Sequence, residues 1–230
     1  MEIYRFIFNR LEENTMVVCG EPGRCVVVDP GYRSDEERDA LEGCLEKHSL
    51  KPEAVLLTHG HMDHIFGVAD FQKRHGVPVY MAPEERSVVD YYQRVTKFGL
   101  PAADPGFTTT DISDGSLIEA AGLSFRVITT PGHSPGGVCY LEEAQKALFT
   151  GDTLFAGAIG RTDLYEGDYD ALIKSIMEKL MPLDGDIEVF PGHGGPSTIG
   201  TERATNPFLE PFNEREEIPE LNETEANDQD

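Results

Sequence analysis

The heptapeptide "THGHMDH", Thr58–His64, decides how this chain is interpreted, because it holds three of the chain's seven histidines and an aspartate. It directly follows the apolar run "AVLL" (residues 54–57), which predicts a buried strand. Three neighbouring imidazoles are unfavourable in a packed apolar core, and they do not stabilise a solvated loop. The pattern therefore predicts a metal ion bound by neutral imidazole nitrogens at the end of this strand.

The rest of the chain alternates strand-like and helix-like segments, which predicts a layered α/β protein. Ser34 and Glu37 form a capping-box pattern at the start of the first helix. The predicted helices are 34–48, 65–75, 83–98 and 168–180. The predicted strands are 4–8, 15–20, 24–29, 53–58, 77–81, 116–120, 123–130, 136–142, 146–150 and 187–191.

Charge and composition narrow the function. The formal net charge is −23, and residues 214–230 carry eight acids and one arginine. Such a chain repels phosphate backbones and anionic lipid, which disfavours nucleic-acid and membrane partners. Because we find neither an apolar run of membrane-spanning length nor a signal peptide, we expect a cytoplasmic protein. We predict one folded domain, residues 1–213, and an acidic tail, 214–230, with the composition of disorder.

Further candidate ligands follow other predicted strands, each beside a glycine. They are His133 in "PGHSPGG", Asp152 in "TGDT" and His193 in "PGHGG". Nitrogen and carboxylate donors without thiolate favour zinc, manganese or iron. With the four candidates in the first motif they number seven, too many for one tetrahedral ion. They fit two ions that share a carboxylate.

Three other residues could be mistaken for ligands. His48 and His75 stand at predicted helix ends, where an imidazolium complements the helix dipole. Asp29 in "VVVDPG" is more typical of a turn-capping acid than of a direct ligand. We predict structural roles for all three.

The motif "HGHMDH", followed by His133, Asp152 and His193, resembles the metallo-β-lactamase superfamily, whose pattern is HxHxDH and then His, Asp and His. The segments "FTGDTLFAGAIGRTDL", "FPGHGGPSTIG" and "ERATNPFL" look most like short bacterial type II glyoxalases, which are hydroxyacylglutathione hydrolase-like proteins. The resemblance implies a four-layer αββα sandwich with the metal site at one edge of its two sheets.

The resemblance also assigns roles to the candidate residues. A first metal would be held by His59, His61 and His133, and a second by Asp63, His64 and His193, with Asp152 bridging them. The implied activity is that of a metal-dependent hydrolase, which cleaves a small-molecule thioester with a hydroxide held between two metal ions. Asp63 would also be catalytic, because its carboxylate can orient that hydroxide. Zinc is the expected metal, with iron or manganese as alternatives.

Several alternatives stay open at this point. Arg161 in "IGRTDL" is either a substrate contact or the partner of Asp163 in an ion pair. Persulfide dioxygenases, which use one iron, resemble the same scaffold, and a lactone or other ester hydrolase could use the same site. The acyl group, the thiol and the oligomeric state are not predicted.

The substrate opening is expected near the third helix. Tyr91, Tyr92 and Phe98 could supply apolar walls, with the Pro/Gly/Thr-rich segment 99–110 as a lid. The alternative is that these aromatic residues only pack the helix onto the sheet.

Overall fold

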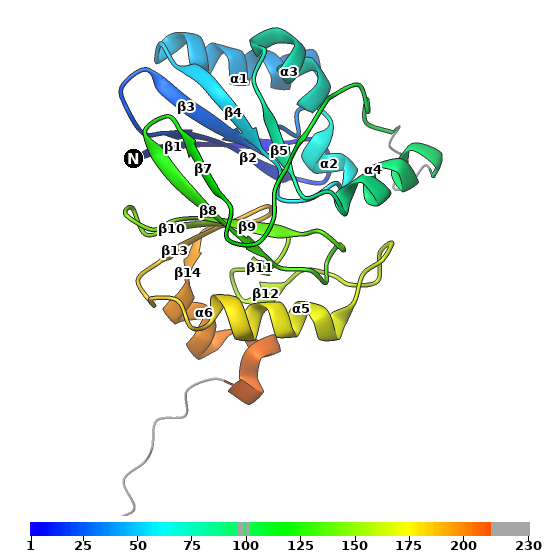
Figure 1. The fold of residues 1–230 in the computed structure, drawn as a ribbon, viewed down its shortest axis with the longest axis vertical. Coiled ribbons are helices and arrows are strands. Elements are labelled where there is room, and N and C mark those ends of the chain that lie inside the picture. Colours follow the sequence, from blue (N-terminus) through cyan, green and yellow to red (C-terminus); the bar gives the residue numbers. More distant parts are fainter. Residues whose placement is uncertain (96–98, 100–101, 213–230) are drawn as a thin grey trace, which may run out of the picture.

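The computed structural model describes residues 1–95, 99 and 102–212. Two six-stranded sheets lie face to face, and helices cover the outer face of each (Figure 1). The predicted four-layer αββα sandwich is therefore confirmed. The predicted acidic tail, 214–230, lies outside the described residues.

The first sheet contains β1 to β6 in chain order. Its first three strands pair antiparallel, and β3 to β6 run parallel. Parallel neighbours need crossover connections, and helices usually supply them. The strands are β1 (Glu2–Phe8), β2 (Glu13–Cys19), β3 (Arg24–Val28), β4 (Lys51–Leu56), β5 (Val79–Met81) and β6 (Thr110–Asp111).

The second sheet has the order β14-β13-β10-β9-β8-β7, and only its β10–β13 pair is parallel. A separate two-stranded hairpin, β11–β12, follows β10 in the chain. The strands are β7 (Leu117–Ala120), β8 (Leu123–Thr129), β9 (Val138–Glu142), β10 (Ala147–Gly151), β11 (Leu154–Phe155), β12 (Ala158–Ile159), β13 (Glu188–Pro191) and β14 (Ser197–Thr198).

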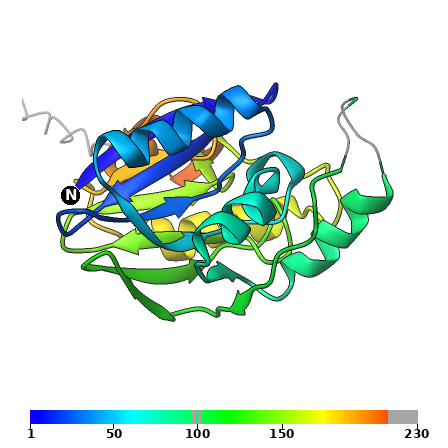
Figure 2. The ribbon, with the colours of Figure 1, turned by 90° about the horizontal axis from the view of Figure 1, so that it is seen from above.

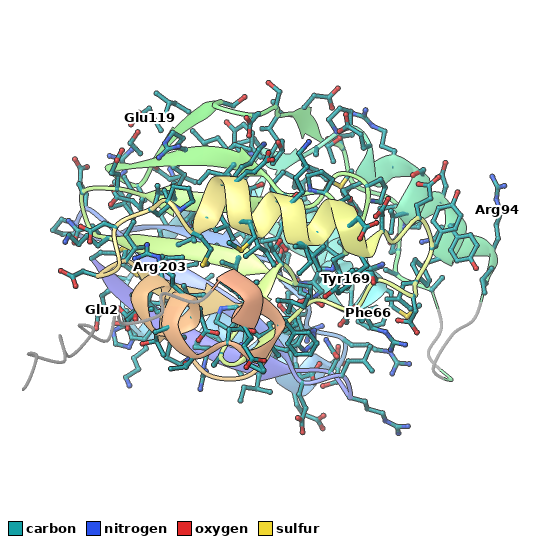
Figure 3. All side chains as sticks on the ribbon, turned by 90° about the horizontal axis from the view of Figure 1, so that it is seen from below. Glu2, Phe66, Arg94, Glu119, Tyr169 and Arg203 are labelled. Atoms are coloured by element: carbon teal, nitrogen blue, oxygen red, sulfur yellow. The ribbon has the colours of Figure 1, made fainter. Side chains whose placement is uncertain are left out.

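The helices form the two outer layers. Figure 2, seen from above, shows α1 and α3 lying over the first sheet, and Figure 3, seen from below, shows α5 and α6 in front of the second sheet. The α-helices are α1 (Asp35–Lys47), α2 (Met62–Ile65), α3 (Val68–His75), α4 (Glu85–Arg94), α5 (Tyr169–Ser175) and α6 (Ile199–Thr205). A π-helical turn, Ile176–Leu180, continues α5, and a 3₁₀ turn, Pro207–Phe212, follows α6. Within the described ranges, no helix is both long and apolar enough to cross a lipid bilayer.

Alternating side chains of the same strands supply different apolar layers. In β2, Val17 packs under the helices of the first sheet, whereas Val18 packs between the two sheets. Val27 and Val26 of β3 divide in the same way. Strands buried on both faces have continuous apolar sequences, which explains why "TMVVC" and "RCVVV" show no alternation of apolar and polar residues. A third apolar layer lies between the second sheet and α5 and α6.

Two predicted helices differ from the structure. The helix expected at 65–75 is divided into α2 and α3. Gly67 lies between them, where an added Cβ would come within 2.6 Å of the Tyr32 ring. The helix expected at 168–180 changes to π-helical hydrogen bonding after Ser175. The short strand β6, the hairpin β11–β12 and the elements after β13 were not predicted.

Candidate metal centre

All seven predicted ligands lie at one edge of the sandwich, along which α2 and α4 lie in Figure 1. Four are in the segment that runs from the end of β4 through α2, and one each follows β8, β10 and β13. They are His59, His61, Asp63, His64, His133, Asp152 and His193. The first sheet thus carries four of the candidate ligands, and the second sheet carries the other three.

Several donor atoms in this cluster are buried without a hydrogen-bond partner among the described residues. They are Nε2 of His59, His61 and His64, and Oδ1 of Asp152. Leaving a polar atom buried and unpaired costs about 1–3 kcal/mol. Four such atoms in one place are therefore expensive unless a ligand satisfies them. The cluster fits a metal ion, because such lone pairs can coordinate one.

The donor atoms form two groups. Those of His59, His61 and His133 lie within 4.8 Å of one another, and so do those of Asp63, His64 and His193. The division is the one that the resemblance implies.

Asp152 lies between the two groups. Its Oδ1 is 3.4 Å from His64 Nε2, and its Oδ2 is 3.4 Å from His133 Nε2 and 3.6 Å from His193 Nε2. Each carboxylate oxygen therefore faces a histidine of the Asp63 group, and Oδ2 also faces a histidine of the His59 group. This is the position that a bridging ligand requires.

Backbone carbonyls orient two of the imidazoles. His133 Nδ1 donates to the carbonyl of Arg161 at 2.7 Å, and His193 Nδ1 donates to that of Glu12 at 3.2 Å. Because a carbonyl only accepts, each Nδ1 carries a proton, and in the neutral ring each Nε2 keeps a lone pair on the side of the cluster. His133 Nε2 lies 2.8 Å from His61 Nδ1, from which it can accept a hydrogen bond. Such contacts fix the tautomer and ring orientation of histidine ligands.

Asp29 orients a third imidazole, a contact that the sequence did not predict. Its Oδ1 accepts from the Thr58 amide at 2.8 Å, and its Oδ2 accepts from Thr58 Oγ1 at 2.5 Å and His64 Nδ1 at 2.9 Å. Asp29 also forms a possible donor group with His59 and His64. Because hydrogen bonds already engage both of its oxygens, the geometry favours an orienting role over a ligand role.

The electrostatics keep the first group neutral. Burial lowers the pKa of His59 well below its usual value and lowers that of His61 to about 3. Burial also lowers the pKa of His133. Burial acts in the same direction on His64, but Asp152 and Asp63 outweigh it and raise the pKa of His64 well above its usual value. Neutral imidazoles can donate lone pairs to a cation at neutral pH.

Glu85, at the start of α4, holds two of the ligand-bearing loops together. Its Oε2 accepts from the Gly60 amide and its Oε1 from the Gly136 amide, both at 2.6 Å. Gly60 separates His59 from His61, so the carboxylate fixes the loop between two predicted ligands. Burial raises the pKa of Glu85 to about 7. This role was not predicted, because "PEERSV" looks like an ordinary helix start.

The glycines beside the candidate ligands are required by close packing. A Cβ on Gly192 would lie 2.4 Å from Asp152 Oδ1 and 2.7 Å from His64 Cε1. Only glycine allows the β13 loop to approach the cluster so closely.

A cavity of about 460 Å³ lies against the cluster. His61, Asp63, His133, Asp152 and His193 form its polar side. Its other walls are mainly apolar and come from the β1–β2 turn, α2, α4, the hairpin β11–β12 and the loop after it. Small-molecule sites commonly combine apolar walls with a few polar groups.

The remaining predicted residues have clear positions. Arg161 lines the cavity, and its Nε and Nη2 donate to the two Asp163 oxygens at 2.7 Å each. Both alternatives for this arginine are thus compatible with its position. His48 bonds to Tyr4 and His75 to Glu42, away from the cluster.

Of the predicted aromatic walls, Tyr92 lines the cavity, and Tyr91 stacks on Tyr165 with ring centroids 3.9 Å apart. Phe98 and part of the expected lid, residues 100–101, lie outside the described residues. The described part, 102–110, contributes nothing to the lining of this cavity.

Comparison with known proteins agrees with the fold and the ligand pattern. Residues 9–193 match the metallo-beta-lactamase superfamily. The chain belongs to this superfamily. The hydroxyacylglutathione hydrolase GloC of Haemophilus influenzae is 35% identical over 201 residues, which cover 86% of this chain and 93% of that protein.

Two solved structures are similar in both sequence and fold. The BLEG-1 B3 metallo-beta-lactamase has a TM-score of 0.82 and 35% identity, with 90% of this chain and 99% of that chain covered. TTHA1623 in a di-iron-bound form has a TM-score of 0.80 and 33% identity, with 90% and 100% covered. The superfamily membership makes this chain a metallo-hydrolase by family, and its relatives include hydroxyacylglutathione hydrolases.

Proposed function

We propose that this metallo-hydrolase cleaves a small-molecule thioester at a centre of two divalent metal ions. The unpaired donor atoms of His59, His61, His64 and Asp152 at the side of a cavity carry this proposal. The similarity to a hydroxyacylglutathione hydrolase supports the thioester as the bond that is cleaved.

The residues that would hold the ions follow the two donor groups. His59, His61 and His133 would hold one ion and Asp63, His64 and His193 the other, with Asp152 shared. When bound, such ions polarise an acyl carbonyl and lower the pKa of water to about 7. The donor set without thiolate suits zinc, iron or manganese. Zinc is our first choice.

The protein's own contribution is positioning. Asp63 Oδ2 lies 3.3 Å from His193 Nε2, and the residue lines the cavity. Its carboxylate can accept a hydrogen bond from the attacking water and turn the water's lone pair toward the substrate. A thiolate is a good leaving group, so a separate general acid is not required.

The experiment combines metal analysis with a substrate panel. Protein loaded with zinc should approach two equivalents of metal and release thiol from a thioester, with lactones and other esters tested alongside. The di-iron form of TTHA1623 makes iron worth testing here. Iron-loaded protein that consumes oxygen with a persulfide, holds one iron and does not cleave thioesters would favour the dioxygenase alternative instead.

A further inference from the structure

The apolar part of the cavity lining comes from two sets of elements. Leu11, Met62 and Tyr92 belong to the β1–β2 turn, α2 and α4. Phe155, Ile159 and Leu164 belong to the hairpin β11–β12 and the loop after it. Ile159 and Met62 are buried, and Phe155 and Leu164 are partly buried. Binding of a ligand group against these side chains is favoured by a free energy proportional to the apolar area that it removes from water.

Apart from the ions that the cluster would hold, the side chains of this lining offer little positive charge. Among the described residues that line the cavity, Arg161 is the only lysine or arginine, and its guanidinium already faces the Asp163 carboxylate. Arg10 and Arg33 line a different cavity, which also contains Glu37. The chain as a whole has a net charge of −23, which opposes the approach of anions. A glutathione moiety carries two carboxylates, and one arginine that already faces an acid cannot neutralise both.

From these two observations we infer that the cavity selects thioesters whose acyl and thiol parts are apolar and uncharged near the metal centre. This inference rests on the proposed thioester hydrolysis. Phe155, Ile159 and Leu164, which we call the apolar wall, are the residues that determine the selectivity. We therefore expect thioesters of charged thiols to bind more weakly, and glutathione is the charged thiol used in the tests below.

A matched pair of non-cleavable ligands tests the preference by binding alone. S-hexyl-N-acetylcysteamine and S-hexylglutathione share one alkyl chain, and only the second carries charges. Titration calorimetry with zinc-loaded protein should show the neutral thioether binding about tenfold more tightly or better. Shortening hexyl to butyl removes two methylenes and should weaken binding roughly 15-fold, because each buried methylene contributes about fourfold in affinity. Equal or tighter binding of S-hexylglutathione would overturn the inference.

Variants connect the preference to the named wall. Leu164→Arg adds a cation to the lining, so it should reduce the difference between the two thioethers at least fivefold. Phe155→Ala should weaken the hexyl ligand while the zinc content, measured in parallel, stays unchanged. Phe208→Ala is the matched control, because Phe208 is exposed and does not line this cavity. If Leu164→Arg and Phe155→Ala both behave like Phe208→Ala, the wall does not select the ligand and the inference fails.

Rates of hydrolysis distinguish a failure of this inference from a failure of the proposed function. The cleavable pair is hexanoyl-N-acetylcysteamine and hexanoylglutathione. Faster cleavage of the neutral thioester supports both proposals. Cleavage that favours the glutathione thioester leaves thioester hydrolysis standing and overturns the inference. If the metal-loaded protein cleaves neither, the proposed function fails, and the inference fails with it.

Discussion

The cluster of candidate metal ligands and the apolar wall both line the cavity, but they are built in opposite ways. The cluster consists of side chains at strand ends of two large sheets, and each of His64, His133 and His193 is oriented by a hydrogen bond at its Nδ1. The wall instead relies on β11 and β12, strands of two residues each, and on the loop that holds Leu164.

The wall has its own support, which comes from the C-terminal elements. Glu202 of α6 is buried, and its Oε2 accepts from the Gly157 amide at the tip of the hairpin at 2.9 Å. Asn206 donates to the Ala158 carbonyl at 3.1 Å and to Glu202 at 2.7 Å. The proposed metal ligands are thus carried by the sheets, whereas the proposed selectivity depends on a small hairpin that is hydrogen-bonded to one helix.

The largest expected effect is on the cluster itself. Asp152→Ala removes the carboxylate that faces both donor groups, so we expect a lower metal content and a loss of activity on the order of a thousandfold. Elemental analysis and thioester turnover on the same sample measure both. His48→Ala is the control, because His48 contacts Tyr4 far from the site. Comparable damage from the two substitutions would show that our division of functional from structural residues is wrong.

The second effect concerns the carboxylate behind the cluster. Glutamine at position 85 has one acceptor oxygen for the two amides of Gly60 and Gly136, so Glu85→Gln should destabilise the protein by about 1–3 kcal/mol. It should weaken metal binding by about 10- to 100-fold, as expected for groups that hold ligands in place. Chemical denaturation and metal titration measure the two losses. Glu84→Gln changes the exposed neighbouring residue and should do neither.

Glu85 also predicts a pH dependence in the metal-free protein. Burial raises its pKa from an ordinary 4.5 to about 7, so the folded state holds the proton more tightly than the unfolded state. The stability from this group is complete below about pH 4.5 and is lost as the pH rises through about 7. The shift corresponds to about 3 kcal/mol. Glu85→Gln should remove this part of the pH dependence, and an unchanged slope between pH 4.5 and 7 would contradict the assignment.

The contrast between cluster and wall also explains what could be predicted from sequence. Metal ligands are rare residue types at fixed spacings, so His59, His61, Asp63 and His64 were evident in one motif. The main strands were evident because burial on both faces demands continuous apolar runs. The hairpin was not, because residues 154–159, "LFAGAI", are too few for a periodic signal. Glu85 and Glu202 were missed because each accepts from a backbone amide of a loop far away in the sequence, and such contacts have no signature in sequence.

A smaller effect is expected where the hairpin meets α6. Glu202→Gln keeps the shape of the side chain but replaces one carboxylate oxygen by an NH2 group, which cannot accept a hydrogen bond. The variant therefore loses one of the hydrogen bonds that Glu202 accepts from Gly157 and Ser197. We expect KM for thioesters to rise about three- to tenfold, with metal content unchanged, because lost ground-state binding appears in KM. Glu210→Gln, which changes an exposed acid of the following turn, is the control. A fall in metal content would instead place Glu202 among the supports of the cluster.

The smallest effect should come from the segment expected to act as a lid. In its described part, Thr108 exchanges two hydrogen bonds with Gln72, each 2.9 Å long, and the buried Ala103 packs into the core of the first sheet. These contacts attach the segment to α3 and the core, and none of its described residues lines the cavity.

Gln72→Ala removes both hydrogen bonds at a partly exposed position. It should lower Tm by about 2–4 °C, as a loss of about 1 kcal/mol does in a chain of this size, and change KM less than about twofold. Thermal denaturation and the thioester kinetics used for Glu202→Gln give the comparison directly. If Gln72→Ala raised KM more than Glu202→Gln did, substrate binding would depend on the segment 102–110 more than on the hairpin. The segment would then be the lid that its Pro/Gly/Thr-rich sequence suggested.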